Sequence, residues 1–256
     1  PGMQTRRGNQ TPVVDIFDQD RLSQAAILKQ KLPTLEAERD ERRKAVEPDF
    51  VTWLEKESAN ADGKSFLPAG AVAHLTLDET LADLADSERK VEIKGKTQWD
   101  DGRFGKAFKC DATNWVDAGA LGDFDQKDSF SYGCWIKPKG NAAGVPIGRM
   151  NNENSFRGYD LYCTNGGVAV HIINTWPTNA IKVNTKSKLK KDVWQHVFVT
   201  YDGSSKAAGV KIYFDGKPQE WTIEQDRLSA TIRAKTPFHV GRRSSGSGFN
   251  GLIDDV

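Results

Sequence analysis

The sequence is poor in cysteine and has no long hydrophobic run. Three cysteines occur among 256 residues, and they form neither a C-x-x-C pair nor a zinc-binding spacing. Because an odd number cannot pair completely within one chain, we interpret Cys110, Cys134 and Cys163 as small buried hydrophobic residues, with one disulfide left open. The longest apolar runs, such as residues 168–173, are far too short to cross a bilayer, so we expect no membrane insertion.

The chain also lacks an excess of charge of either sign. Its 36 lysines and arginines balance 35 acidic residues, which leaves a formal charge of +1. Such a balance gives no general attraction to a polyanion, so we expect no nucleic-acid partner. The start, Pro1-Gly2-Met3, has neither an initiator methionine nor the apolar core of a signal peptide, which is typical of an internal piece of a longer protein.

Motifs of common catalytic sites are missing. The sequence has no G-x-S-x-G nucleophile turn, no phosphate-binding loop and no dinucleotide fingerprint. The four histidines are scattered through strand-like runs without a metal-binding spacing, and packing explains them better than catalysis does. We therefore predict a protein that is not an enzyme.

The first 62 residues divide into two parts of different composition. Residues 1–17 are polar and irregular, and we predict an extended arm there. Residues 18–62 are rich in Glu, Lys, Arg, Ala and Leu, with apolar residues at helical spacing, and end in a linker. Pro33 is expected to kink or restart this helix, and Pro48 suits the first turn of another. We predict a helical hairpin docked on another structure, because charged helices this short are marginal alone.

Residues 66–256 have the pattern of an antiparallel β protein. Turn signals such as Asn165-Gly166 and Asp215-Gly216 separate short runs of alternating, β-branched and aromatic residues. The run 193–201 carries bulky residues on both faces, which predicts a central strand. No convincing helix occurs in this part of the sequence. The pattern predicts an all-β fold, a two-sheet antiparallel sandwich or jelly roll.

Several motifs of this region occur together in the order of a known family. Residues 194–203 read W-Q-H-V-F-V-T-Y-D-G, and residues 249–256 read F-N-G-L-I-D-D-V. With residues 73–79 and 129–138, they resemble the laminin-G/concanavalin A-like (LamG-like) domain over about residues 70–256. The resemblance implies a jelly-roll sandwich that works by binding. The superfamily includes glycosidases with an E-x-D-x-E cluster, but this sequence has no such cluster.

A narrower resemblance rests on three segments. Residues 174–181, 202–206 and 209–211 are similar to the version of this domain found inside large exported planctomycete proteins that also carry a cytochrome c-type domain. This similarity implies an extracytoplasmic location (periplasmic, cell-surface or secreted) as part of a larger protein. The haem domain would then lie outside this fragment, so we expect no haem here.

The family resemblance also implies a calcium ion held by carboxylates and main-chain carbonyls. Asp78 and Asp254 belong to strands that lie together when the sandwich closes, so we take them as candidate metal ligands. The alternative is that these acids only form turns or surface charges.

A candidate ligand site follows from one expected hairpin. Residues 159–163 and 168–173 pair across a short turn, so the segments entering and leaving the hairpin emerge side by side. This places an aromatic ring beside amides and a guanidinium, groups that suit a sugar. We predict that these groups belong to Trp176, Asn174, Arg157, Tyr159 and Asn154. For Trp176, packing against a neighbouring loop is the alternative.

The leading functional hypothesis is a non-catalytic carbohydrate-binding (lectin-like) domain with a glycan or polysaccharide ligand. The rival is a structural or protein–protein interaction module with a protein partner. The fold does not decide between them, because binding sites are grafted onto folds.

Overall fold

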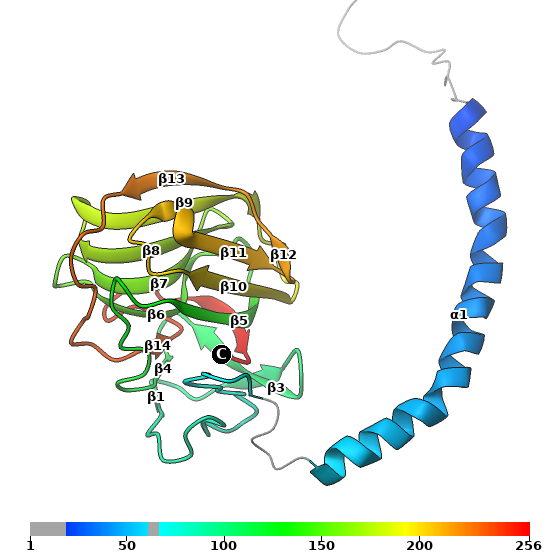
Figure 1. The fold of residues 1–256 in the computed structure, drawn as a ribbon, viewed down its shortest axis with the longest axis horizontal. Coiled ribbons are helices and arrows are strands. Elements are labelled where there is room, and N and C mark those ends of the chain that lie inside the picture. Colours follow the sequence, from blue (N-terminus) through cyan, green and yellow to red (C-terminus); the bar gives the residue numbers. More distant parts are fainter. Residues whose placement is uncertain (1–18, 61–66) are drawn as a thin grey trace, which may run out of the picture. The chain divides into compact units, whose positions relative to one another are not determined.

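The computed structural model describes residues 19–60 and 67–256. The chain divides into two units, residues 1–62 and residues 63–256, which are described separately (Figure 1). The predicted extended arm, residues 1–17, lies outside the described residues.

The described part of the first unit, residues 19–60, is one continuous helix, α1 (Gln19–Asn60), so the predicted hairpin is wrong. Pro33 and Pro48 both lie inside this helix rather than ending it. A proline removes one main-chain hydrogen bond and favours a bend, but the surrounding Ala, Leu, Glu, Lys and Arg residues are strong helix formers. Near the second proline, the Thr52 hydroxyl donates to the carbonyl oxygen of Pro48, 2.9 Å away.

The second unit is a sandwich of two antiparallel sheets, which confirms the predicted all-β jelly roll (Figure 1). The eight-stranded sheet has the order β1 (Glu92–Lys94), β4 (Trp115–Asp117), β14 (His239–Val240), β6 (Gly144–Asn151), β7 (Arg157–Thr164), β8 (Gly167–Thr175), β9 (Asn179–Lys188) and β13 (Trp221–Asp226). The seven-stranded sheet has the order β12 (Lys217–Pro218), β11 (Val210–Phe214), β10 (Gln195–Tyr201), β5 (Phe130–Pro138), β15 (Asn250–Asp254), β3 (Lys106–Asp111) and β2 (Trp99–Asp101). A short 3₁₀ turn, η1 (Ala207–Gly209), leads into β11.

Two predicted hairpins are present in the expected registers. Thr164 pairs with Gly167 across Asn165-Gly166, and Phe214 pairs with Lys217 across Asp215-Gly216. Both residues of each turn have positive φ, as a two-residue type I′ turn requires. Strand β10 lies between β11 and β5, which confirms its predicted central position.

The core lies between the two sheets and follows the period-2 alternation of the strands. In β5 the inward side chains of Phe130, Tyr132, Cys134 and Ile136 are buried, while the residues between them are more exposed. All three cysteines are free and buried, as small hydrophobic residues would be. Burial raises the pKa of the Cys134 thiol well above its ordinary value, so this thiol stays protonated.

Candidate ligand-binding surface

The hairpin of β7 and β8 positions the candidate site. At the end opposite its turn, the backbone N–H of Trp176 donates to the carbonyl oxygen of Ser155 over 2.9 Å. The guanidinium Nε of Arg157 donates to the carbonyl oxygen of Asn174 over 3.2 Å. The segments that enter and leave the hairpin therefore lie side by side, as the turn geometry predicts.

The Trp176 ring is half-buried, and it packs with Phe156 against a small apolar cluster of Met150, Ile173 and Ala180. Its ring centroid lies 5.9 Å from that of His171, at an interplanar angle of 85°. The Lys182 ammonium lies 5.4 Å from the ring centroid. The indole is thus fixed on its protein side while part of it reaches solvent.

Lys182 on β9, which lies over this ring, is linked to a carboxylate on β13. Lys182 forms an ion pair with Glu224 at 2.8 Å, and the Asn184 amide donates to the same carboxylate over 3.1 Å. The predicted contact residue Asn154 is exposed in the loop before β7. Such donors and acceptors beside an exposed aromatic surface can take the hydroxyls of a sugar whose C–H face lies on the ring.

Tyr159 is not on this surface, because it points into the core. It is 1% exposed, and its hydroxyl donates to the carbonyl oxygen of Gly122 over 2.9 Å. Burial raises the pKa of the Tyr159 phenol, and its ring lies 5.0 Å from that of Phe130. Period-2 alternation along β7 puts Tyr159, Leu161 and Cys163 on the inner face, a signal already present in the sequence.

Asn174 lies in the segment that leaves the hairpin, but its side chain is engaged in hydrogen bonds within the protein. Its side chain is 9% exposed, and its amide donates to the carbonyl oxygen of Thr231 over 2.6 Å. Its side-chain oxygen accepts from the Thr175 hydroxyl over 2.8 Å. Asn174 therefore positions the loop that carries Trp176, which leaves little of its side chain for a ligand.

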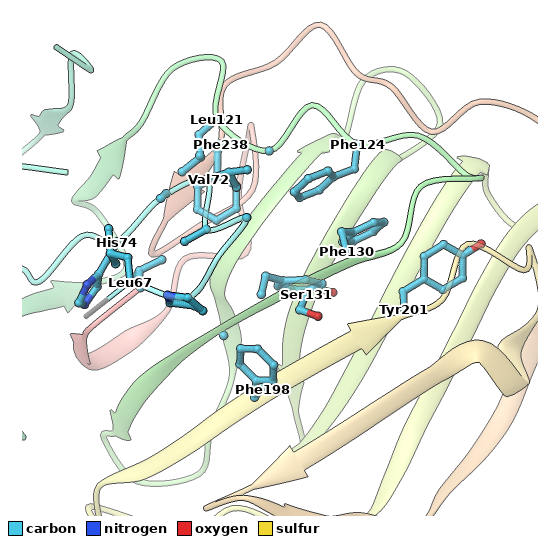
Figure 2. A pocket seen from close by; sticks show the side chains of 18 of the residues that line it. Leu67, Val72, His74, Leu121, Phe124, Phe130, Ser131, Phe198, Tyr201 and Phe238 are labelled. Carbon is cyan, nitrogen blue, oxygen red and sulfur yellow. The ribbon is translucent and has the colours of Figure 1, made fainter. Parts of the chain in front are cut away.

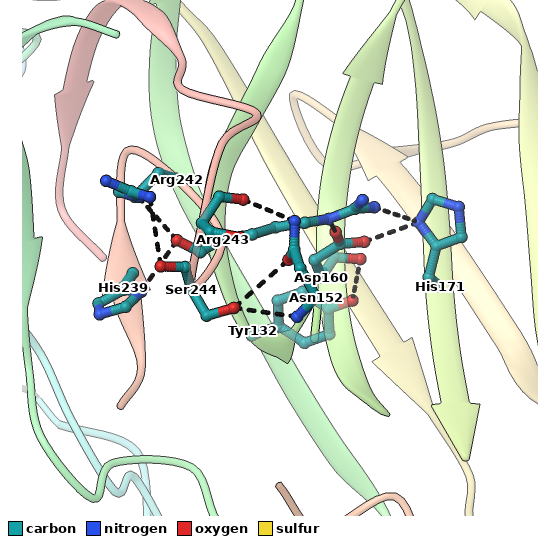
Figure 3. A network of polar contacts seen from close by, with 9 residues as sticks. Tyr132, Asn152, Asp160, His171, His239, Arg242, Arg243 and Ser244 are labelled. Atoms are coloured by element: carbon teal, nitrogen blue, oxygen red, sulfur yellow. Dashed lines mark hydrogen bonds and ion pairs between the residues drawn. The ribbon is translucent and has the colours of Figure 1, made fainter. Parts of the chain in front are cut away.

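Behind Trp176 lies a buried charged network that the sequence analysis missed (Figure 3). Asp160 on β7 is fully buried, although it sits on the outer face of the eight-stranded sheet. One of its carboxylate oxygens lies 2.7 Å from His171 Nδ1, and the other accepts from Arg243 Nε over 2.5 Å. The guanidinium of Arg243 also lies 4.8 Å from the ring centroid of Tyr162.

This network fixes the segment that covers the sheet. Next to Arg243, Ser244 and Ser245 bond to Asn152 at the end of β6, at 2.9 Å and 2.6 Å. Burial opposes ionisation of Asp160, but the charges of Arg243 and His171 outweigh it and lower the pKa of the carboxyl. His171, which contacts the Trp176 ring, is thereby held in place. No local pattern in the sequence marks Arg243 as the partner of Asp160.

Both candidate calcium ligands, Asp78 and Asp254, accept hydrogen bonds from the backbone of one turn, residues 102–106. Asp254 is fully buried and accepts from the backbone N–H groups of Arg103 and Phe104, at 2.7 Å and 3.1 Å. Its other carboxylate oxygen is buried without a hydrogen-bond partner. Asp78 accepts from the N–H of Lys106 over 2.6 Å. Burial raises the pKa of Asp254, and the charges of Asp255 and Asp78 add to this effect.

Two carboxylates fall short of the six to eight oxygens that calcium takes. Within residues 19–60 and 67–256, no group of three or more His, Cys, Asp and Glu side chains is placed to hold a metal ion. The unpartnered oxygen of Asp254 suits a cation, but carbonyl oxygens and water would have to supply most of its ligands.

The match to a family model decides the relationship. The model of the concanavalin A-like lectin/glucanases superfamily (Laminin_G_3) matches residues 111–256. The chain belongs to this superfamily. The LamG-like resemblance of the sequence motifs is thereby confirmed. A comparison with curated proteins found no match.

Solved structures with a similar fold include bacterial toxin domains. The binding domain of Paraclostridial Mosquitocidal Protein 1 aligns with a TM-score of 0.56 and 16% identity, over 72% of this chain and 47% of that one. A structure of botulinum neurotoxin type C, which interacts with two ganglioside molecules, aligns with a TM-score of 0.51 and 16% identity, over 72% of this chain and 46% of that one. The binding domain of botulinum neurotoxin DC in complex with rat synaptotagmin II aligns with a TM-score of 0.50 and 16% identity, over 72% of this chain and 46% of that one. The chain spans about half the length of these toxin structures, and at this identity the likeness shows the fold alone.

Proposed function

We propose that residues 67–256 form a non-catalytic carbohydrate-binding module whose ligand lies on Trp176. The observation that carries this proposal is the partly open indole, held from behind by His171 and flanked by Lys182. Sugar rings stack their C–H faces on such a fixed aromatic surface, while nearby polar groups bond to the hydroxyls. Asn154, Arg157 and the Lys182–Glu224 pair supply such groups within the same surface.

The carboxylates near Trp176 do not suit glycoside hydrolysis. A glycosidase needs a general acid with a raised pKa, facing a second carboxylate across the scissile bond. The hydrogen bond from Lys182 lowers the pKa of Glu224, and Asp160 is buried with a lowered pKa. Neither group can serve as a proton donor at neutral pH, which supports binding rather than catalysis.

Protein recognition is the second candidate. The toxin domains that share this fold include one that interacts with gangliosides and one in complex with the protein synaptotagmin II. The fold therefore accommodates both glycan and protein ligands, and the side chains at the site determine which class binds. An amphipathic aromatic ring beside an ion pair also suits a protein partner.

The setting that we propose is an exported, larger protein of the planctomycete cytochrome c-containing kind, in an extracytoplasmic compartment. The support is the resemblance of residues 174–181, 202–206 and 209–211 to that group. In the described residues, no helix is long and apolar enough to span a membrane. We further propose a calcium ion at Asp254 and Asp78, supported by the unpartnered carboxylate oxygen of Asp254.

A glycan array probed with the full chain tests the proposed class. Binding to a defined set of glycans, competed by the free sugar, is the expected result. No glycan signal together with a protein partner that binds at the Trp176 surface would favour the second candidate. New reducing ends after incubation with polysaccharides would show that the protein is an enzyme after all.

A further inference from the structure

Apolar surface is exposed in both units of the chain. In the sandwich it lines an open cleft of 720 Å³ beside β5, whose walls include Phe130 and Phe198 (Figure 2). In the first unit it lies on α1, where every side chain from residue 23 to residue 53 is exposed. Eight of these are large hydrophobic residues, namely Ile27, Leu28, Leu32, Leu35, Val46, Phe50, Val51 and Trp53. Exposed apolar surface of this extent on one helix marks a site of interaction.

Six of the eight, together with Ala25, form one stripe along α1. Each residue turns by about 100° around a helix axis, so residues three, four, seven or eleven apart share a face. Residues 25, 28, 32 and 35 follow this spacing, and so do residues 46, 50 and 53. Arg39 lies on the same stripe, between the two groups. Pro33 and Pro48 lie on other faces of the helix, so neither ring interrupts the stripe.

The stripe is symmetric about Arg39. Its apolar residues lie seven, eleven and fourteen positions before Arg39 and again seven, eleven and fourteen positions after it. When two copies of α1 run antiparallel about a two-fold axis at Arg39, apolar residues of one copy therefore meet apolar residues of the other. The pairs between the two copies are Ala25 with Trp53, Leu28 with Phe50, and Leu32 with Val46. Leu35 meets the aliphatic stem of Arg43.

The charges beside the stripe favour this antiparallel direction. Lys29 and Lys31 flank its first half, and Glu47 and Asp49 flank its second half. Lys29 and Glu47 are eighteen residues apart, which is five full turns, and so are Lys31 and Asp49. Each lysine thus shares a flank with one carboxylate. Equal flanks meet in an antiparallel pair, so lysine faces carboxylate, whereas a parallel pair sets lysines level with lysines and carboxylates level with carboxylates.

We propose that α1 is a homodimerisation helix, which pairs antiparallel with α1 of a second copy of this chain about an axis at Arg39. The apolar stripe forms the centre of the interface, and four lysine–carboxylate pairs flank it. Arg39 needs no partner across the axis, because its guanidinium lies 2.8 Å from the carboxylate of Asp40 in the same helix. A polar residue at one central position also sets the register of paired helices. Under the proposed function, on which this last consequence alone rests, two Trp176 surfaces give the dimer avidity for a repeating glycan.

Sedimentation equilibrium of the full chain tests the proposal. We expect a particle of twice the 28.4 kDa mass of one chain. Leu32→Asp places a charge in the stripe and should weaken the dimer about 100-fold or more. Ile27→Asp is the matched control, since Ile27 is 52% exposed against 55% for Leu32 but lies off the stripe, and its dimer should be unchanged. A natural chain that stays monomeric, or equal weakening in the two variants, would overturn the proposal.

Charge reversal tests the antiparallel direction. A variant with Lys29→Glu and Lys31→Glu sets like charges against Glu47 and Asp49 of the second copy, so its dimer should be about tenfold weaker at low ionic strength. Adding Glu47→Lys and Asp49→Lys restores opposite charges at every pair, and the dimer should recover. In a parallel dimer, like charges would lie level in all three versions. Undiminished dimerisation of the first variant, or no recovery in the fourfold variant, would contradict the antiparallel pairing.

Discussion

Arg243 Nε lies 2.5 Å from the carboxylate of Asp160, although 83 residues separate the two in the chain. This buried pair joins the covering segment after β14 to the outer face of β7. It also holds His171, which contacts the Trp176 ring at 5.9 Å between centroids. The proposed ligand surface therefore depends on a charged pair that is almost entirely buried.

An Arg243→Ala variant should lose about 3–5 kcal/mol of unfolding free energy, because it leaves Asp160 as a buried charge without its main partner. Urea unfolding of the purified chain measures this loss. Arg242→Ala is the matched control, since Arg242 lies 4.2 Å over the Trp115 ring and is only half-buried. Its loss should be about 1 kcal/mol or less. Equal losses in the two variants would contradict the special role of Arg243.

The same pair predicts how stability depends on pH. Asp160 has a lower pKa in the folded chain than its ordinary value of 3.8. Such a carboxyl contributes stability above the unfolded pKa, and this stability is lost as the pH falls through the folded pKa. Unfolding free energy should therefore fall below about pH 4, and less steeply in Asp160→Asn. Urea unfolding from pH 5 to pH 3 measures both slopes, and parallel slopes would contradict this account.

The pKa of Asp254 is shifted in the opposite direction from that of Asp160, upward from its ordinary value. Burial above all raises its pKa, and the charges of Asp255 and Asp78 add to this effect. Because the folded state binds this proton more tightly, the ionised carboxylate destabilises the fold above the folded pKa. With a chelator at pH 7, Asp254→Asn should be at least as stable as the natural chain, because an amide carries no charge into this buried position.

If calcium binds at Asp254, it should make the natural chain more stable than Asp254→Asn. Added calcium should raise the Tm of the natural chain but leave Asp254→Asn unchanged, because a ligand stabilises only the form that binds it. Magnesium, which demands a stricter octahedral geometry, serves as the control ion. If calcium leaves the Tm of the natural chain unchanged, the proposed calcium site is wrong.

Local patterns in the sequence predicted the features of the fold that depend on neighbours in the chain. The hairpin around Asn165-Gly166 needs only turn residues and alternating strands, and it correctly brought Arg157 beside Asn174. Period-2 alternation would also have removed Tyr159 from the proposed surface. The single helix α1 was missed because Pro33 and Pro48 were given more weight than the strong helix formers around them.

Features that depend on distant parts of the chain could not be predicted in the same way. Arg243 pairs with Asp160 only because β14 and β7 both flank β6 in the finished sheet. The buried network emerges only when strands far apart in sequence are assembled.

The binding affinity of Trp176→Ala for a glycan recognised by the natural chain tests the central claim most directly. Trp135→Ala is the matched control, because Trp135 is half-buried and faces outward on the other sheet. Isothermal titration should show Trp176→Ala binding about tenfold more weakly or not at all, and Trp135→Ala binding normally, while the Tm falls by a similar small amount in both variants. Unchanged glycan affinity in Trp176→Ala, or a Tm loss of several degrees that accounts for its weaker binding, would contradict the proposed site.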